Sequence, residues 1–167
     1  YERVFGGNNI SGTIQGPIVV NIEETGCRPI IIGELYGGGN QAGYSVYGYD
    51  GRTPIEPGEN VTRKWADPQV NVKSFTSIGN IYGGGYGETA VMMGNPTVNI
   101  NVVGGKYSGQ TSDTYFTDFT PDVANKRYSK LIGNNIVYVP AHEKNTSGAI
   151  YNVFGGGNAA KVVGNTN

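Results

Sequence analysis

The chain has 167 residues, is rich in glycine and tyrosine, and carries a formal net charge of −1. Without a basic stripe it lacks the electrostatic signature of nucleic-acid binding, and no apolar run reaches the roughly 18 residues that a membrane-spanning helix needs. The 28 glycines follow no three-residue period, which excludes collagen and predicts many turns.

One short sequence motif, here called the repeated phrase, occurs four times in the chain, at 4–8, 35–40, 81–86 and 153–158. Each copy has an aliphatic residue, an aromatic residue and a run of glycines, and internal repetition of this kind predicts a stacked architecture. The aromatic anchors of the four copies are Phe5, Tyr36, Tyr82 and Phe154. We expect these rings to align as a core ladder rather than as a cofactor site, with about 0.5–1.5 kcal/mol for each stacked pair.

Strands are predicted in chain order at 18–22, 70–72 and 98–102, where apolar and polar residues alternate. Gly, Asn and Pro between these segments end strands sharply, and no window shows the apolar spacing of a long helix. The sequence therefore predicts an all-β chain. The repeated asparagines are Asn21, Asn71 and Asn99, which align as an amide ladder or face water, and Asn40 and Asn158, which are candidates for left-handed backbone beside the glycines.

The predicted fold is a parallel β-helix, or β-solenoid, of three to four coils formed by a single segment over residues 1–167. The anchors lie 31, 46 and 72 positions apart, so the length of the repeat varies. A β-helix tolerates insertions at one turn more readily than a propeller blade does. Two long loop insertions are expected, at about 43–66 and 107–147. Because neither end carries the polar cap of a complete solenoid, we also expect the chain to be a fragment of a longer repeat protein.

The pattern aromatic-Gly-Gly-Gly-Asn, followed by Ala-x-Val-x-Gly-Asn-Thr and by Val-Asn-Ile, resembles the repeats of large bacterial cell-surface, adhesin-like β-helix proteins of Bacteroidota and Firmicutes. The match is fullest at 81–105 and leaves both insertions unmatched. The resemblance implies an exported, extracellular or surface-attached protein with no assigned catalytic residue. A shared scaffold does not establish a shared task.

No cofactor or metal is predicted. The segment 84–88 approaches a calcium-binding glycine repeat, but only once, whereas such sites need consecutive copies. No Gly-Lys-Ser/Thr follows a glycine run, so the phosphate-binding fingerprint fails. Cys27 is the only cysteine and is interpreted as a structural residue.

The first insertion holds the candidate contact residues for a glycan or a protein partner. Tyr and Trp side chains present flat apolar faces with hydrogen-bonding edges, which suits either ligand. The candidates are Tyr44, Tyr47, Tyr49 and Trp65. An equally weighted alternative is that these rings cover the open side of the stack.

The leading hypothesis is a structural or adhesive surface protein whose rigid stack displays loops. A second possibility is end-to-end self-association into filaments through uncapped coils. The alternative class is a carbohydrate-active β-helix enzyme, for which the best candidates are Asp113, Asp118 and Asp122 with Arg127. A glycosidase needs two carboxylates about 5–10 Å apart across a cleft, and loop spacing cannot establish that distance. The competing interpretation of these acids is a solvated loop, and His142 is interpreted as an exposed polar residue.

Overall fold

The chain is built from β-strands. The computed structural model describes residues 1–24, 29–49, 57–58, 65–100, 120–122, 127–132, 135–140 and 149–167. Every regular element in these ranges is a strand, which confirms the all-β prediction. The described part of the chain has no helix, and so none of a length and hydrophobicity suited to crossing a bilayer.

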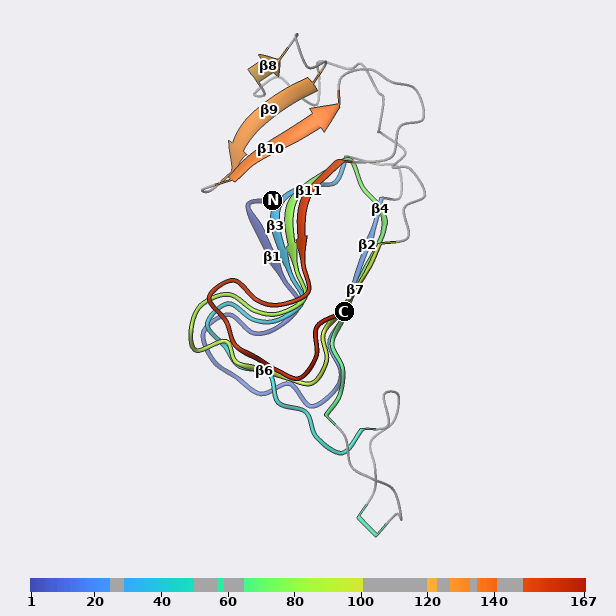
Figure 1. Cartoon of the computed structure of the whole chain (residues 1–167), viewed down its shortest axis with the longest axis vertical. Coiled ribbons are helices and arrows are strands. Elements are labelled where there is room, and N and C mark those ends of the chain that lie inside the picture. The colour runs from blue at the N-terminus through green and yellow to red at the C-terminus, as the bar shows by residue number, and fades with distance from the viewer. Residues whose placement is uncertain are drawn as a thin grey trace.

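Two parallel sheets face each other across the molecule (Figure 1). The first, here called the anchor sheet, has the order β1-β3-β5-β11 and consists of β1 (Arg3–Phe5), β3 (Ile31–Tyr36), β5 (Ser77–Tyr82) and β11 (Ala149–Phe154). The second, here called the asparagine sheet, has the order β2-β4-β7 and consists of β2 (Val19–Glu23), β4 (Gln69–Ser74) and β7 (Thr97–Ile100). A short parallel pair, β6 (Met92–Met93) and β12 (Val162–Val163), lies between the ends of the two sheets.

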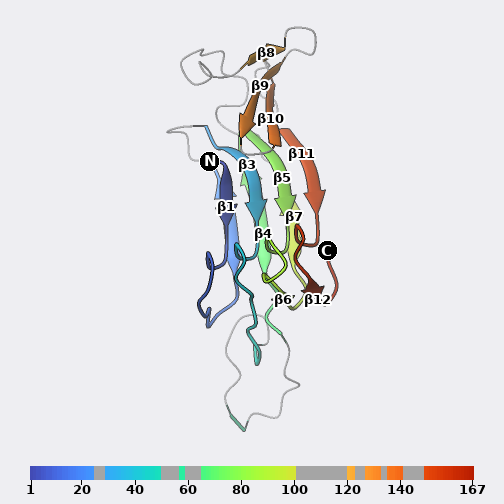
Figure 2. The same cartoon turned by 90° about the vertical axis from the view of Figure 1, so that its left-hand side faces the viewer.

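Successive passes of the chain lie on top of one another as four layers: 3–23, 31–49 with 65–74, 77–100, and 149–167. Figure 2 shows the anchor strands side by side in the order β1, β3, β5, β11. The register places Phe5 beside Tyr36, Tyr36 beside Tyr82, and Tyr82 beside Phe154. Each copy of the repeated phrase therefore occupies the same position in its own layer, an arrangement consistent with a solenoid-like fold.

The glycines after each anchor allow the layers to approach closely. A Cβ on Gly37 would collide with the carbonyl oxygen of Gly83, and a Cβ on Gly83 would collide with that of Gly155. The amide of Gly37 donates to the carbonyl of Tyr82 at 2.8 Å, and that of Gly83 donates to Phe154 at 2.9 Å. The glycine run is thus required by contact between layers and not only by a turn.

The hydrophobic core lies mainly between the two sheets. One cluster of buried side chains combines both sheets and the corner between β4 and β5: Ile22, Ile32, Leu35, Val70, Val72, Phe75, Ile78 and Ile81. A second cluster lies beside β6 and contains Ile18, Tyr44, Val46, Ala66 and Met92. The predicted strands at 18–22 and 70–72, with the described part of the one at 98–102, supply the asparagine-sheet side of this core through Val20, Ile22, Val70, Val72 and Val98, whereas Ile100 is exposed.

The first excursion leaves the stack later than its predicted start at position 43. Tyr44 forms a parallel bridge with Met92, and the amide of Ala66 donates to the carbonyl of Val46 at 2.8 Å. Tyr47 and Trp65 then form an antiparallel bridge at the base of the excursion. Tyr44 therefore belongs to the second layer, because its backbone groups pair with the neighbouring layer, and Val46 pairs with Ala66 across the base of the excursion.

The second excursion, predicted as a loop at 107–147, contains an antiparallel sheet. Its strands are β8 (Thr120–Asp122), β9 (Arg127–Ile132) and β10 (Asn135–Pro140), in the order β10-β9-β8. Two residues, Gly133 and Asn134, separate β9 from β10 in the sequence, and a Gly-Asn pair between two apolar runs is a hairpin signal. Strand β10 also lies close to β3, β5 and β11 of the anchor sheet.

Candidate functional site

The four aromatic anchors form one continuous stack of rings. Their centroids are 4.8 Å apart for Phe5 and Tyr36, 4.7 Å for Tyr36 and Tyr82, and 4.9 Å for Tyr82 and Phe154, with interplanar angles of 12°, 7° and 11°. The stack was expected in the core: Tyr36 and Tyr82 are buried, but the four rings lie outside the two clusters of core side chains. The reason is strand alternation: Leu35 points into the core, so its neighbours Glu34 and Tyr36 point to the opposite face of the anchor sheet.

A charged pair lies beside this stack. Arg3 Nε contacts Glu34 Oε2 at 2.6 Å, and the hydrogen bond to Glu34 raises the pKa of Arg3. The Arg3 guanidinium carbon lies 4.7 Å from the centre of the Tyr86 ring, a cation–π geometry. The Tyr86 ring in turn meets the Tyr36 ring edge to face at 5.7 Å.

The hydroxyl of Tyr36 is held from a distant part of the chain. Asn158 Nδ2 donates a hydrogen bond to Tyr36 Oη at 3.2 Å. Burial raises the pKa values of Tyr36 and Tyr82, because a phenolate loses hydration there. Both rings therefore remain neutral at ordinary pH.

These groups surround a pocket of about 450 Å³ on the outer face of the anchor sheet. One wall comes from the sheet and the other from the segments that follow the glycine runs. The lining residues are Arg3, Glu34, Gln41, Tyr82, Tyr86, Gly87, Glu88, Asn158 and Ala159. We call this space the anchor pocket.

Left-handed backbone occurs at the rim of the anchor pocket, one residue beyond the predicted positions. Gln41 and Ala159 have φ values of 61° and 56°, and Gly87, at the corresponding place in the third layer, has 88°. The prediction of left-handed geometry for Asn40 and Asn158 is wrong, because both residues pair with Tyr86 in parallel β-bridges.

A polar row precedes the aromatic anchors by two residues in every copy, and its pattern was missed in the sequence. Its members are Arg3, Glu34, Asn80 and Asn152, on the same face of the anchor sheet as the rings. Asn152 Nδ2 donates to Asn80 Oδ1 at 2.8 Å, which links the third and fourth layers. The signal was the recurrence of a polar residue at a fixed offset from each anchor.

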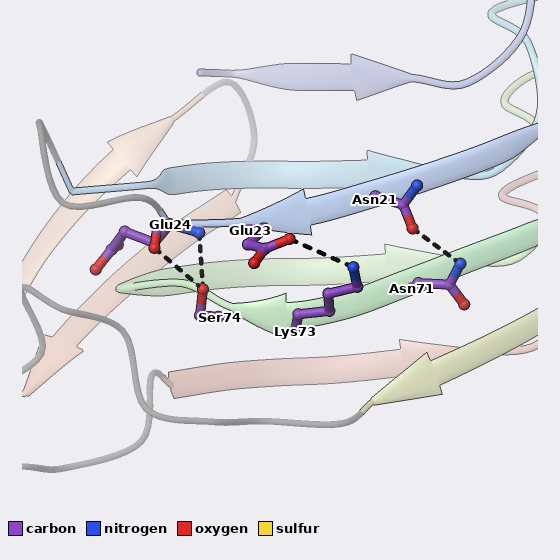
Figure 3. Close-up of polar contacts among 6 residues, drawn as sticks. All are labelled: Asn21, Glu23, Glu24, Asn71, Lys73 and Ser74. Carbon is purple, nitrogen blue, oxygen red and sulfur yellow. Dashed lines mark hydrogen bonds and ion pairs between the residues drawn. The ribbon is translucent and has the colours of Figure 1, made fainter.

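The asparagine sheet has a second set of polar contacts on its outer face. Asn71 Nδ2 donates to Asn21 Oδ1 at 3.0 Å, and Asn99 Nδ2 donates to Asn71 Oδ1 at 2.8 Å, so the three residues form an amide ladder. Beside it, Lys73 and Glu23 form an exposed ion pair at 3.3 Å (Figure 3). A shallow depression of about 590 Å³ lies over β4 and β7 here.

A buried carboxylate, Glu24, fastens the corner that follows β2. Its side chain accepts hydrogen bonds from the Thr76 hydroxyl at 2.6 Å and from the Ile30 amide at 2.9 Å. Its own amide donates to Ser74 Oγ at 2.7 Å (Figure 3). Glu24 therefore joins the first layer to the second layer and to the corner between the second and third layers.

The predicted contact residues of the first insertion divide into two groups. Tyr44 is only 3% exposed and is a core residue, and the hydroxyl of half-buried Tyr49 donates to the carbonyl of Gln15 at 2.8 Å. Tyr47 is 52% exposed, and its ring lies 4.7 Å from the ring of Trp65 at an interplanar angle of 55°. The structure thus leaves the Tyr47–Trp65 pair at the surface and uses the other two rings for packing.

Two of the four predicted catalytic candidates fall outside the described residues. Asp113, Asp118, His142 and Cys27 lie outside the ranges that the structure describes. Asp122 and Arg127 are opposite one another in the register of β8 and β9. Among the described residues, no three His, Cys, Asp or Glu side chains gather in a way that could hold a metal ion.

Comparison with known proteins found no match to this chain among protein-family models, curated protein sequences or solved structures.

Proposed function

We propose that this chain is a segment of a parallel β-helix scaffold in an extracellular or cell-surface protein of the structural or adhesive kind. The observation that carries the proposal is the common register of the four copies of the repeated phrase. An architecture in which one motif stacks on itself gains stability from contacts between neighbouring layers and extends in one direction, as a stalk or spacer requires.

The use of polar side chains supports a scaffold over a hydrolase. The buried carboxylates Glu24 and Glu34 are both engaged in bonds between layers, the first to Thr76 and the second to Arg3. The asparagine amides bond to one another across layers. These groups stabilise the stack through bonds between its layers.

The Tyr47–Trp65 pair is the proposed contact element for a glycan or protein. Its two rings come from opposite sides of the base of the first excursion and are joined by an antiparallel bridge. Because the bridge continues directly from the second layer, the pair is displayed on a rigid base, which lowers the entropy lost on binding.

A binding screen with matched variants tests this function. The chain is applied to arrays of glycans and extracellular proteins, and the Tyr47→Ala/Trp65→Ala double variant is compared with Tyr49→Phe. We expect the double variant to lose binding while its urea unfolding curve is unchanged, and Tyr49→Phe to bind like the wild type. Equal binding by the double variant would show that the Tyr47–Trp65 pair is not the contact element. Release of shortened oligosaccharides from a polysaccharide would contradict a non-enzymatic scaffold.

A further inference from the structure

The anchor pocket offers a mixed set of hydrogen-bonding groups. Arg3 and Gln41 provide N–H donors, while the Glu88 carboxylate and the amide oxygens of Gln41 and Asn158 provide acceptors. Its volume of about 450 Å³ lies within the range of small-molecule sites. The pocket is therefore large enough and polar enough for a ligand that both donates and accepts hydrogen bonds.

The charges of the pocket disfavour an anion. The positive charge of Arg3 is compensated by Glu34 at 2.6 Å, and Glu88 adds a further negative charge to the lining. A multivalent cation is disfavoured as well, because no metal-binding group of three His, Cys, Asp or Glu occurs among the described residues. An uncharged ligand with several hydroxyl groups meets these conditions best.

Three side chains of the pocket, Arg3, Tyr86 and Asn158, are held before any ligand arrives. Arg3 is held by Glu34 and rests on the ring of Tyr86, and Tyr86 is held in turn by the edge contact with Tyr36. Asn158 is fixed through the hydroxyl of Tyr36. A site whose groups are already immobilised loses little side-chain entropy on binding, and this favours weakly interacting ligands such as polyols.

The backbone at the rim of the pocket positions one further polar side chain, that of Gln41. Gln41 has a φ of 61°, a left-handed conformation that glycine adopts without strain, as Gly87 does at the same place in the next layer. The carbonyl of Gln41 accepts a hydrogen bond from Thr89 Oγ1 at 2.6 Å, and its side chain packs over Gly87. The left-handed position recurs at Gly87 and Ala159 and so belongs to the fold, and glutamine at this position adds an amide to the rim of the pocket.

From these observations we infer that the anchor pocket binds a neutral saccharide residue through its hydroxyl groups. Neighbouring hydroxyls of a sugar each donate and accept, which matches the presence of carboxylate, amide and guanidinium groups together in the lining of the pocket. The site is separate from the Tyr47–Trp65 pair and lies on the stack itself.

The test uses the full chain and an array of defined neutral, uronate-containing and sulfated oligosaccharides, followed by calorimetric titration of the tightest neutral binder. Glu88→Ala removes an exposed carboxylate acceptor and is expected to weaken binding about tenfold or more. Gln41→Gly removes the rim amide while keeping a residue suited to the backbone, and is expected to weaken binding about fivefold. Glu23→Ala, which removes an exposed carboxylate from the asparagine sheet, is the matched control and should bind like the wild type.

Each other outcome overturns the inference. These outcomes are no retention of neutral oligosaccharides, preference for the acidic ones, or equal loss in Glu23→Ala and Glu88→Ala. If the Tyr47→Ala/Trp65→Ala variant loses the sugar while Glu88→Ala keeps it, the ligand belongs to the proposed contact element and not to the anchor pocket. The scaffold proposal survives all of these results, because it rests on the register of the stack.

Discussion

Tyr36 and Phe154 occupy the same place in the repeated phrase but different places in the stack. Tyr36 is fully buried between the rings of Phe5 and Tyr82, whereas Phe154 is 45% exposed and has one stacked neighbour. The residues beside each anchor along the chain are almost the same. Position in the repeat therefore sets local geometry, and position in the stack sets burial and the expected cost of substitution.

The aliphatic residue before each anchor should show the largest difference between inner and outer layers. Leu35 is fully buried in the core and Val153 is 46% exposed. Leu35→Ala should lower the free energy of unfolding by about 2–5 kcal/mol, and Val153→Ala by about 0.5 kcal/mol. Urea denaturation of both variants measures the difference. Similar losses for the two would show that the outer layer is covered in solution.

Alkaline pH should destabilise the buried part of the second layer. Burial raises the pKa of Tyr44 to about 12, against about 10 in an unfolded chain. The folded state then holds the proton more tightly, so the stabilisation is complete below about pH 10 and is lost as the pH rises through about 12. At about 1.4 kcal/mol per pKa unit, the loss from Tyr44 is about 2–3 kcal/mol.

Tyr44→Phe provides the control for this pH dependence. The free energy of unfolding, measured with urea at pH 8 and at strongly alkaline pH, should fall less in the variant than in the wild type. The part of the loss that comes from Tyr36 and Tyr82 should remain, because burial raises their pKa values too. An unchanged alkaline loss in Tyr44→Phe would contradict the assignment of a buried phenol at this position.

The stability lost when the glycine after an anchor is replaced by alanine should also depend on the layer. In Gly37→Ala the new methyl group meets the carbonyl oxygen of Gly83 in the next layer, which can move only with the backbone. We expect a loss of about 1–3 kcal/mol. Gly155→Ala meets the Cβ of Thr166 at 2.9 Å, and that side chain lies near the end of the chain and can shift, so the loss should be smaller. Thermal unfolding of the two alanine variants separates these cases.

Alanine substitutions in the amide ladder should lower the free energy of unfolding least. Asn71 bonds to both Asn21 and Asn99, whereas Asn21 makes one of these bonds. Each such bond contributes about 0.5–1.5 kcal/mol, so Asn71→Ala should cost roughly twice as much as Asn21→Ala. Equal losses would mean that water replaces the ladder bonds without a change in free energy.

The sequence allowed prediction of the repeat, the all-β class and the pairing of the anchors, because these depend on short patterns that recur. It did not reveal the anchor pocket. Arg3 and Glu34 lie 31 positions apart, and Tyr86 and Asn158 lie 72 apart, so only the register of the layers places them together. The small antiparallel sheet was missed although Gly133 and Asn134 carry a hairpin signal, since the segment was interpreted as a single insertion.

The residues alone establish which segments are equivalent, since alternation and glycine runs are local properties of the chain. The tertiary structure decides what each equivalent segment contacts. The same alternation that places Leu35 in the core turns Tyr36 and Glu34 to the opposite face, and Tyr36 is buried between two rings whereas Phe154 is stacked on one. Burial and pocket formation depend on neighbours from distant parts of the chain, and these exist only once the layers have stacked.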